Sequence, residues 1–183
     1  NPSTGDILGA IEKIPAKNIY ILPNNGNIIL AAQQAKDLTK DKAVHVIPTK
    51  NIPQGIAAMI NFVEGFTPEQ NEEAMTEALS EVKSGQVTYA VRDTVIDGKE
   101  IKAGNIMGLS DKTIEIVGTD VVDTTIDLLK KMMDEESELI TIYYGEEGTT
   151  EKIAKAIEGI DDEMEVEIQY GGQPIYYYFV SVE

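Results

Sequence analysis

Polar side chains gather in two short segments, each of which lies between a predicted strand and a predicted helix. The amides, the hydroxyl and the lysine ammonium in these segments can form hydrogen bonds, and two glycines allow close approach to the backbone. The first N–H groups of a helix, together with the helix dipole, favour a bound anion. The candidate binding residues are therefore Asn24, Asn25, Asn27, Thr49, Lys50 and Gln54, next to Gly26 and Gly55. The same residue types also have a structural use, because Asn and Gly form turns and Asn or Thr caps helices.

Each polar segment follows an apolar run that is typical of a buried strand. The runs Ile19–Leu22 and Val44–Ile47 are short and lack a regular alternation, as expected for strands that are covered on both faces. Two such strands joined by a helix predict a right-handed βαβ unit, whose loops emerge at the same edge of a parallel sheet. Open α/β sheets place their binding sites at this edge. We therefore expect the segments 23–27 and 48–55 to lie together and to form the functional surface.

Several familiar catalytic patterns are missing from the chain. Neither polar segment has the glycine spacing of a Rossmann fingerprint or the GK[ST] ending of a Walker A loop, which argues against ATP binding by either route. There is no cysteine, and the single histidine, His45, lies inside the second predicted strand. We interpret His45 as a packed strand residue, because one histidine cannot build a catalytic triad or a multi-histidine metal site.

Two further sets of charged residues have a solvent-exposed interpretation beside a functional one. Glu146 and Glu147 follow a predicted strand and could act as metal ligands or as acid and base, but negative charge is also favoured near the start of a helix. Asp120, Asp123 and Asp127 share one helix face and could hold magnesium with a substrate phosphate. We expect a solvated surface for both sets and predict no metal site.

Arg92 and Asp93 end the predicted strand 86–91 and leave two alternatives open. Arginine is scarce in this chain, and this one closes an apolar run. The pair either forms a structural ion pair or presents Arg92 as an anchor for a partner. We include Arg92 among the candidate partner-binding residues.

The charge of the chain limits its partners. A net charge of -17 argues against nucleic acid and against anionic membrane surfaces. No apolar stretch reaches the roughly 18 residues needed to span a bilayer, and no secretory signal opens the chain, so we expect a cytoplasmic location without membrane insertion. Residues 134–167 contain thirteen acidic residues and two lysines. Such a run is usually a solvated surface, and its functional alternative is steering toward a basic partner protein.

The predicted order of elements indicates an α/β protein with α+β features. A helix, two βα units and a further helix precede an antiparallel meander with turns at Asp97-Gly98 and Ser110–Lys112, and a second α/β region closes the chain. Two α/β lobes with one or more mixed sheets, at about 1–85 and 86–183, would satisfy this order within a single domain. The apolar periodicity predicts that these side chains face the core: Ile28, Ala31, Ala32, Ala35 and Leu38; Ile56, Met59, Ile60 and Val63; Val122, Ile126, Leu129 and Met133. The last strand is predicted at 175–182, with aromatic rings on both faces.

Several segments in order along the whole chain resemble one known family. ILPNNGNIILAAQQA, HVIPTKNIPQGIAAM, AVRDTVIDGKEIKAGNIMGL and YGGQPIYYYFVSVE are similar to the carboxy-terminal domain of the bacterial fatty acid kinase component that binds ATP. This family is related to dihydroxyacetone kinases and is also known as Dak phosphatase-like. The resemblance implies a fold related to the fatty-acid-binding partner protein and to the part of dihydroxyacetone kinase that binds the substrate. It also implies that ATP and magnesium bind elsewhere, in a longer protein of which this chain, which opens at Asn1 without methionine, is a fragment.

The resemblance further implies a role in protein recognition. The family domain is expected to dock a separate fatty-acid-binding protein, whose bound acyl chain is phosphorylated to acyl phosphate. Other domains of the same longer chain, and a second copy of this chain, are further expected partners. Dihydroxyacetone kinases hold their substrate on a histidine that His45 does not match, so we carry over no catalytic residue and expect no enzyme activity from this chain alone. The alternative is a small-molecule-binding domain that takes a phosphorylated or carboxylate ligand at the same loops.

Overall fold

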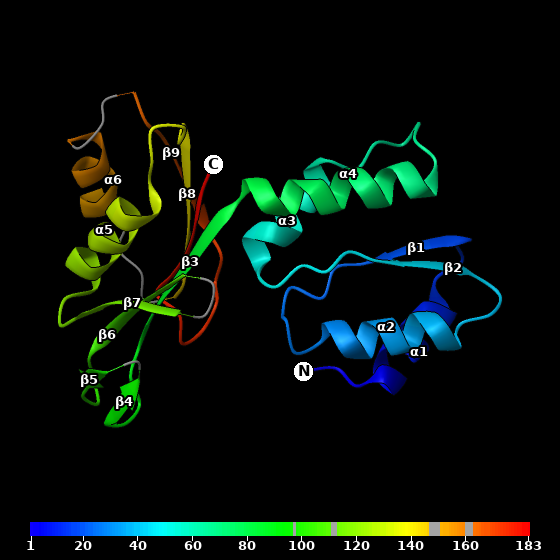
Figure 1. The fold of residues 1–183 in the computed structure, drawn as a ribbon, viewed down its shortest axis with the longest axis horizontal. Coiled ribbons are helices and arrows are strands. Elements are labelled where there is room, and N and C mark those ends of the chain that lie inside the picture. The colour runs from blue at the N-terminus through cyan, green and yellow to red at the C-terminus, as the bar shows by residue number, and fades with distance from the viewer. Residues whose placement is uncertain (97, 111–112, 147–150, 160–162) are drawn as a thin grey trace. The chain divides into compact units, whose positions relative to one another are not determined.

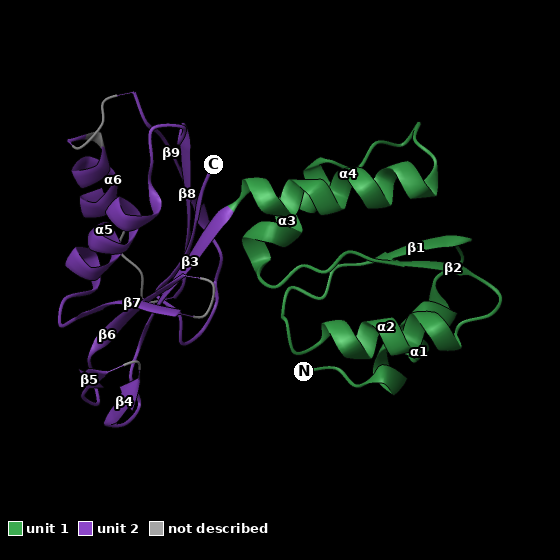
Figure 2. Cartoon of the chain, viewed as in Figure 1, with its two compact units in different colours: residues 1–82 green, residues 83–183 purple. Residues whose placement is uncertain are grey.

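The computed structural model describes residues 1–96, 98–110, 113–146, 151–159 and 163–183. They form two compact units, Asn1–Val82 (unit 1) and Lys83–Glu183 (unit 2), which are coloured separately in Figure 2. The predicted turn residues Asp97, Asp111 and Lys112, and the candidate Glu147, lie outside the described residues.

Unit 1 is built around a parallel pair of strands (Figure 1). The register pairs Ile19 with Val44 and Ile21 with Val46, so the predicted parallel βαβ unit is confirmed. Helices α1 and α2 lie on one side of this pair, and α3 and α4 lie on the other. The elements are α1 (Thr4–Lys13), β1 (Asn18–Ile21), α2 (Ile29–Leu38), β2 (Ala43–Val46), α3 (Ile52–Ile60) and α4 (Pro68–Glu81).

Local capping fixes where the helices of unit 1 begin. The Ser3 hydroxyl accepts a hydrogen bond from the Asp6 N–H, and the Asp6 carboxylate accepts one from the Ser3 N–H, which forms the predicted capping box. Thr67 and Gln70 form a second capping box ahead of α4, also as predicted. Helix α3 begins after Asn51, whose side-chain oxygen accepts a hydrogen bond from the Gln54 N–H at 3.0 Å.

The prediction for the buried face of α3 was wrong. The helix packs inward through Pro53, Gly55, Ala57 and Ala58, whereas Met59 is 61% and Ile60 is 76% exposed. Small side chains allow the helix to approach its neighbours closely, so the larger aliphatic side chains of α3 are left outside. Val63 lies beyond the end of the helix and is exposed, and Leu38 at the end of α2 is exposed for the same reason of position, while Ala32 and Ala35 are buried as predicted.

Unit 2 contains a mixed sheet of six strands in the order β7-β6-β3-β10-β8-β9. Among these described strands the β8–β9 pair is parallel and the other four neighbouring pairs are antiparallel, so the predicted meander and mixed sheet are confirmed. Strand β10, the last in the sequence, lies between β3 and β8. The strands are β3 (Lys83–Tyr89), β6 (Ile106–Ser110), β7 (Thr113–Gly118), β8 (Leu139–Tyr144), β9 (Glu165–Tyr170) and β10 (Tyr178–Val182), with a separate hairpin of β4 (Thr94–Ile96) and β5 (Lys99–Ile101).

One large core lies between this sheet and its helices. Helices α5 (Val121–Met132) and α6 (Glu151–Glu158) cover the same face of the sheet (Figure 1). The buried apolar side chains of α5 are Leu128, Leu129 and Met132, so the predicted stripe was right only at Leu129. The inner face also takes Thr124 and Thr125, whose hydroxyls are satisfied by backbone carbonyls one turn earlier, and this lets polar residues lie where the periodicity placed apolar ones.

The last strand is shorter than predicted. It begins at Tyr178, whose ring is fully buried in the core of unit 2. Ile175 has a φ of 74°, which is incompatible with an extended strand, so β10 starts three residues later than the predicted range.

Candidate functional site

The two polar segments of unit 1 meet, as the βαβ argument predicted. The Asn24 N–H donates a hydrogen bond of 2.9 Å to the Thr49 hydroxyl oxygen. Thr49 is fully buried, so this bond ties the first segment to the second from inside. The edge of the sheet therefore carries one continuous polar surface made of both loops.

Asn24 occupies a position that glycine makes possible. Its φ of 52° is in the left-handed region, which asparagine tolerates better than most residues. Its side-chain amide packs directly on Gly55, where an added Cβ would lie 2.3 Å from Asn24 Oδ1. That oxygen is buried and has no hydrogen-bond partner among the described residues. Burial of an unpaired polar atom costs free energy of order 1–3 kcal/mol, so it marks a position where a donor would be gained.

Some of the candidate residues also do the structural work that their types allow. Asn25 Oδ1 accepts a hydrogen bond from the Asn27 N–H at 2.9 Å and shapes the first loop. Gln54 Oε1 accepts one from the Lys50 N–H at 2.8 Å and shapes the second. The side chains of Asn27 and Lys50 are exposed, so polar groups of both loops face solvent.

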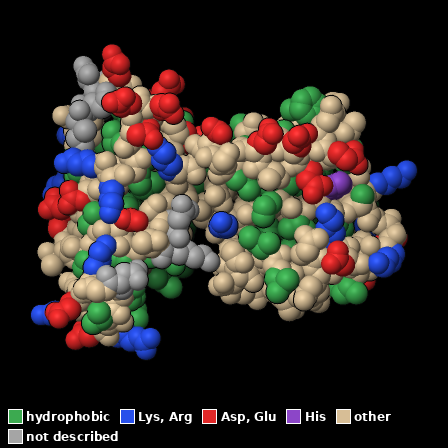
Figure 3. Space-filling model, in the orientation of Figure 1, with side chains coloured by type: hydrophobic (Ala, Val, Ile, Leu, Met, Phe, Trp, Pro, Cys, Tyr) green, Lys and Arg blue, Asp and Glu red, His purple; other side chains and the backbone are tan. Residues whose placement is uncertain are grey.

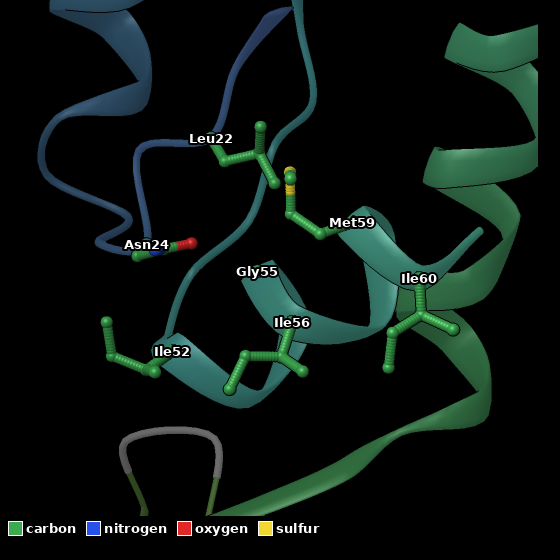
Figure 4. Close-up of a pocket in the computed structure, with 7 residues that line it drawn as sticks. All are labelled: Leu22, Asn24, Ile52, Gly55, Ile56, Met59 and Ile60. Atoms are coloured by element: carbon green, nitrogen blue, oxygen red, sulfur yellow. The ribbon is translucent and has the colours of Figure 1, made fainter. Parts of the chain in front are cut away.

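An apolar pocket of about 390 Å³ adjoins these loops in unit 1. Figure 4 shows Asn24 on one side of it and the side chains of α3 on the other. It is lined by Leu22, Asn24, Ile52, Gly55, Ile56, Met59 and Ile60. Hydrophobic side chains also gather over α3 in the space-filling view (Figure 3).

The pocket residues of α3 were missed because the apolar periodicity had placed them in the core. One signal could have found them. The segment Gly55–Ala58 carries small residues at Gly55, Ala57 and Ala58, and a helix with one small-residue face and one aliphatic face can bury the first and expose the second. The lining contains no titratable side chain, so the pocket is suited to holding an aliphatic group rather than to proton transfer.

His45 is a packed residue of β2. Its Nδ1 lies 2.6 Å from Glu72 Oε2, and its ring stacks on Tyr20 with centroids 4.9 Å apart. Burial raises the pKa of the Tyr20 phenol in the same cluster. These contacts hold α4 against the sheet and agree with the structural interpretation of His45.

The remaining charged candidates belong to unit 2. Arg92 is exposed and forms no salt bridge with any residue that the structure describes, while Asp93 Oδ1 accepts a hydrogen bond from the Ala103 N–H at 2.7 Å. Asp120 caps α5 through the N–H groups of Val122 and Asp123. Within the described ranges, no group of three or more histidine or acidic side chains could hold a metal ion. Among the same residues, no helix has the length and apolar character needed to cross a bilayer.

Relatives of known sequence match the whole chain. The protein SAB1090 of Staphylococcus aureus is 46% identical over 186 residues, which cover 100% of this chain and 34% of that protein. Protein YloV of Bacillus subtilis is 45% identical over 187 residues, with the same two shares. The chain therefore spans about a third of the length of these relatives.

Solved structures share the fold. The Fak B3 protein of Streptococcus pneumoniae, loaded with linoleic acid, matches with a TM-score of 0.70 at 17% identity, covering 100% of this chain and 76% of that one. The dihydroxyacetone kinase of C. freundii, in complex with AMP-PNP and Mg²⁺, matches with a TM-score of 0.64 at 15% identity, covering 100% and 42%. Both similarities concern the fold, and they confirm the predicted fold relationship.

A family model covers every residue of the chain. It represents the FakA-like C-terminal domain of fatty acid kinases, and it matches residues 1–183. Together with the relatives of 45–46% identity, this match confirms the family that the sequence motifs had indicated. The chain belongs to the FakA-like C-terminal family of fatty acid kinases.

Proposed function

We propose that this chain is the non-catalytic recruitment domain of a fatty acid kinase. In this proposal it docks an acyl-loaded fatty-acid-binding protein, so that ATP and magnesium bound elsewhere in a longer chain can phosphorylate the fatty acid to acyl phosphate. The observation that carries the proposal is the continuous surface in unit 1, where two hydrogen-bonded polar loops adjoin the exposed aliphatic face of α3. Family membership supports the same role.

The surface has the composition of a protein interface. Ile52, Met59 and Ile60 are 41%, 61% and 76% exposed, and contiguous exposed aliphatic side chains of this kind mark interaction sites. The loop residues Asn27 and Lys50 supply a polar border. Burial of this face would contribute about 25 cal/mol for each Å² of apolar surface removed from water. A docked partner would gain from proximity, since holding its carboxylate near the ATP site makes the reaction effectively intramolecular.

Calorimetric titration of the chain with the acyl-loaded partner tests this proposal. The double variant Met59→Ser/Ile60→Ser should weaken binding about tenfold or more, because it removes the aliphatic centre of the surface. The double variant Asn24→Ala/Lys50→Ala tests the loops in the same way. Leu38→Ser is the matched control, since Leu38 is 61% exposed in the same unit but does not line the pocket. If both double variants fold and bind with unchanged affinity, the assigned surface is wrong.

A second candidate function is favoured by the unpartnered oxygen of Asn24. A pocket of about 390 Å³ is within the range of small-molecule sites, which run from about 300 to 1,000 Å³. An aliphatic carboxylic acid could place its chain along Ile56 and Met59, donate to Asn24 Oδ1 from its protonated form, and present its charged form to Lys50. Fold neighbours that were solved with bound linoleic or heptadecanoic acid support a ligand of this class.

Thermal unfolding with added oleate separates the two candidates. A ligand that binds the folded chain at 100 times its Kd stabilises it by about 2.7 kcal/mol, so a pocket ligand should raise Tm in the absence of any protein partner. Recruitment alone predicts no shift with oleate and saturable heat with the loaded partner. A Tm rise that Met59→Ser/Ile60→Ser abolishes would assign the ligand to this pocket.

A further inference from the structure

Ile175 in unit 2 adopts a backbone conformation that isoleucine rarely takes. Its φ is 74°, and the Tyr176 N–H donates to the Pro174 carbonyl at 2.8 Å, which makes Ile175 the centre of a γ-turn. The γ-turn with a central φ of about +75° is rare and strained, and a branched Cβ adds to the strain. The side chain is nevertheless 63% exposed, so core packing does not explain why isoleucine is there.

Neighbouring groups hold this turn in place from several sides. The Thr88 hydroxyl donates to the Ile175 carbonyl at 3.0 Å, and the Gln173 amide donates to the Tyr143 carbonyl at 2.8 Å. Gly145 passes so close that an added Cβ would lie 2.4 Å from the Tyr176 carbonyl oxygen. A strained residue persists only where its surroundings fix it, and such residues concentrate at binding sites. The turn is therefore a rigid support that presents Ile175 to solvent.

A small notch of about 130 Å³ lies beside this turn. Its chemistry combines one exposed carboxylate with two phenol rings and a side-chain amide. Tyrosine faces attract cations through the ring quadrupole, and a carboxylate supplies the counter-charge. The lining residues are Glu146, Gln173, Pro174, Ile175, Tyr176 and Tyr177.

We propose that this notch receives an arginine side chain of a partner protein. A guanidinium group stacks on aromatic faces and pairs with a carboxylate in one plane, which an ammonium group cannot do. Ile175 would pack on the aliphatic stem of the arginine. The net charge of -17 and the acidic run from Asp134 to Glu167, in which Glu146 lies, complement a basic partner surface. Burial, followed by the charges of Glu183 and Glu167, raises the pKa of the nearby Tyr143 phenol, in agreement with a negative local field.

This site belongs to unit 2 and is independent of the surface proposed on unit 1. Recruitment through the loops and α3 can fail while the notch still binds arginine, and the reverse also holds. The notch therefore needs a test that uses neither the acyl-loaded partner nor a fatty acid.

Nuclear magnetic resonance titration of the 183-residue chain with a short peptide provides that test. The probe is acetyl-Gly-Arg-Gly-amide, and its control contains citrulline, which has the shape of arginine without the charge. The arginine peptide should shift the amides of Gly145, Tyr176 and Tyr177 in a saturable way and bind about fivefold more tightly than the citrulline peptide. If the two peptides shift these amides equally, or if neither shifts them, the assignment is wrong.

Two substitutions sharpen the result. Glu146→Gln should lower the affinity for the arginine peptide about fivefold, whereas Glu100→Gln, on the separate β5 hairpin, should leave it unchanged. Ile175→Gly should weaken binding while Tm stays equal or rises, because glycine relieves the strained φ. Loss of affinity without loss of Tm cannot come from unfolding. Unchanged affinity in Glu146→Gln would overturn the proposal.

Discussion

The helices of unit 1 contact their neighbours through alanine and glycine, whereas the helices of unit 2 contact their sheet through leucine, isoleucine and methionine. In unit 1, Ala32, Ala35 and Ala58 are completely buried while Leu30 and Ile60 are 68% and 76% exposed. In unit 2, the fully buried side chains include Leu128, Leu129, Ile140, Ile142, Ile153 and Ile157.

This difference separates stability from recognition within one short chain. Large aliphatic side chains stabilise a fold in proportion to the area that they remove from water, so unit 2 has the stronger core. Unit 1 has small buried clusters and keeps its larger aliphatic side chains on the surface, where they are available to a partner. Three comparisons of matched variants test this division, from the largest expected effect to the smallest.

Truncation of an aliphatic side chain should have very different costs in the two units. Leu128→Ala removes a completely buried side chain from the core of unit 2 and should lower the free energy of unfolding by about 2–5 kcal/mol. Ile60→Ala in unit 1 should change it by no more than about 0.5 kcal/mol. Urea unfolding of the two variants measures both values. A loss for Ile60→Ala as large as that for Leu128→Ala would show that the face of α3 is part of a core.

Adding one methyl group at two glycines should have opposite signs. Gly55→Ala would place Cβ against Asn24 Oδ1 and should destabilise unit 1 by about 1–3 kcal/mol, because the amide must leave its buried position. Gly9→Ala, inside α1 with open space around the added atom, should stabilise by about 0.5–1 kcal/mol. Thermal unfolding distinguishes the signs directly. A neutral Gly55→Ala would mean that Asn24 is free to move and is not a fixed part of the site.

The smallest expected effect concerns acid stability. The Lys83 ammonium and the Ser137 hydroxyl hold the pKa of Asp134 below its ordinary value of 3.8, and the Ser3 hydroxyl and N–H do the same for Asp6. A lowered pKa contributes stability that is present above the unfolded value and is lost as pH falls through the folded one. Stability should therefore decline below about pH 3.8.

Asparagine at these positions should flatten that decline in the unit concerned. Asp134→Asn acts in unit 2 and Asp6→Asn in unit 1, and hydrogen exchange of amides in each unit, measured down the acid limb, reports them separately. Both carboxylates are at the surface, so solvent screening keeps the effect small. An acid limb that keeps its slope in both variants would assign the decline to other carboxylates.

Local signals predicted the fold well wherever a few neighbouring residues decide the structure. The pairs Ser3 with Asp6 and Thr67 with Gln70 start α1 and α4 as capping boxes, because each box is complete within one turn. The parallel pairing of β1 and β2 followed from two apolar runs joined by a helix. The meeting of Asn24 and Thr49 followed from that topology.

Nonlocal packing limited the rest of the prediction. Apolar periodicity ranks Ile56, Met59 and Ile60 above Ala57 and Ala58 as core residues, but it contains no information about how closely a neighbouring helix approaches. The pocket was therefore invisible in the sequence. The γ-turn at Ile175 was missed for a related reason, since Thr88, 87 residues earlier, helps to hold it.

The place of β10 in the sheet has a consequence for how the protein is made. Residues 178–182 pair with β3 on one side and with β8 on the other, so neither neighbour is complete without them. During translation, β3, β6 and β7 can leave the ribosome and assemble, but the six-stranded sheet cannot close until these residues have emerged. Until then β3 and β8 expose unpaired backbone groups, which favour association with other chains. Unit 2, which has the stronger core, should thus be the last part of this chain to fold, and chaperones would have most to protect in it during synthesis.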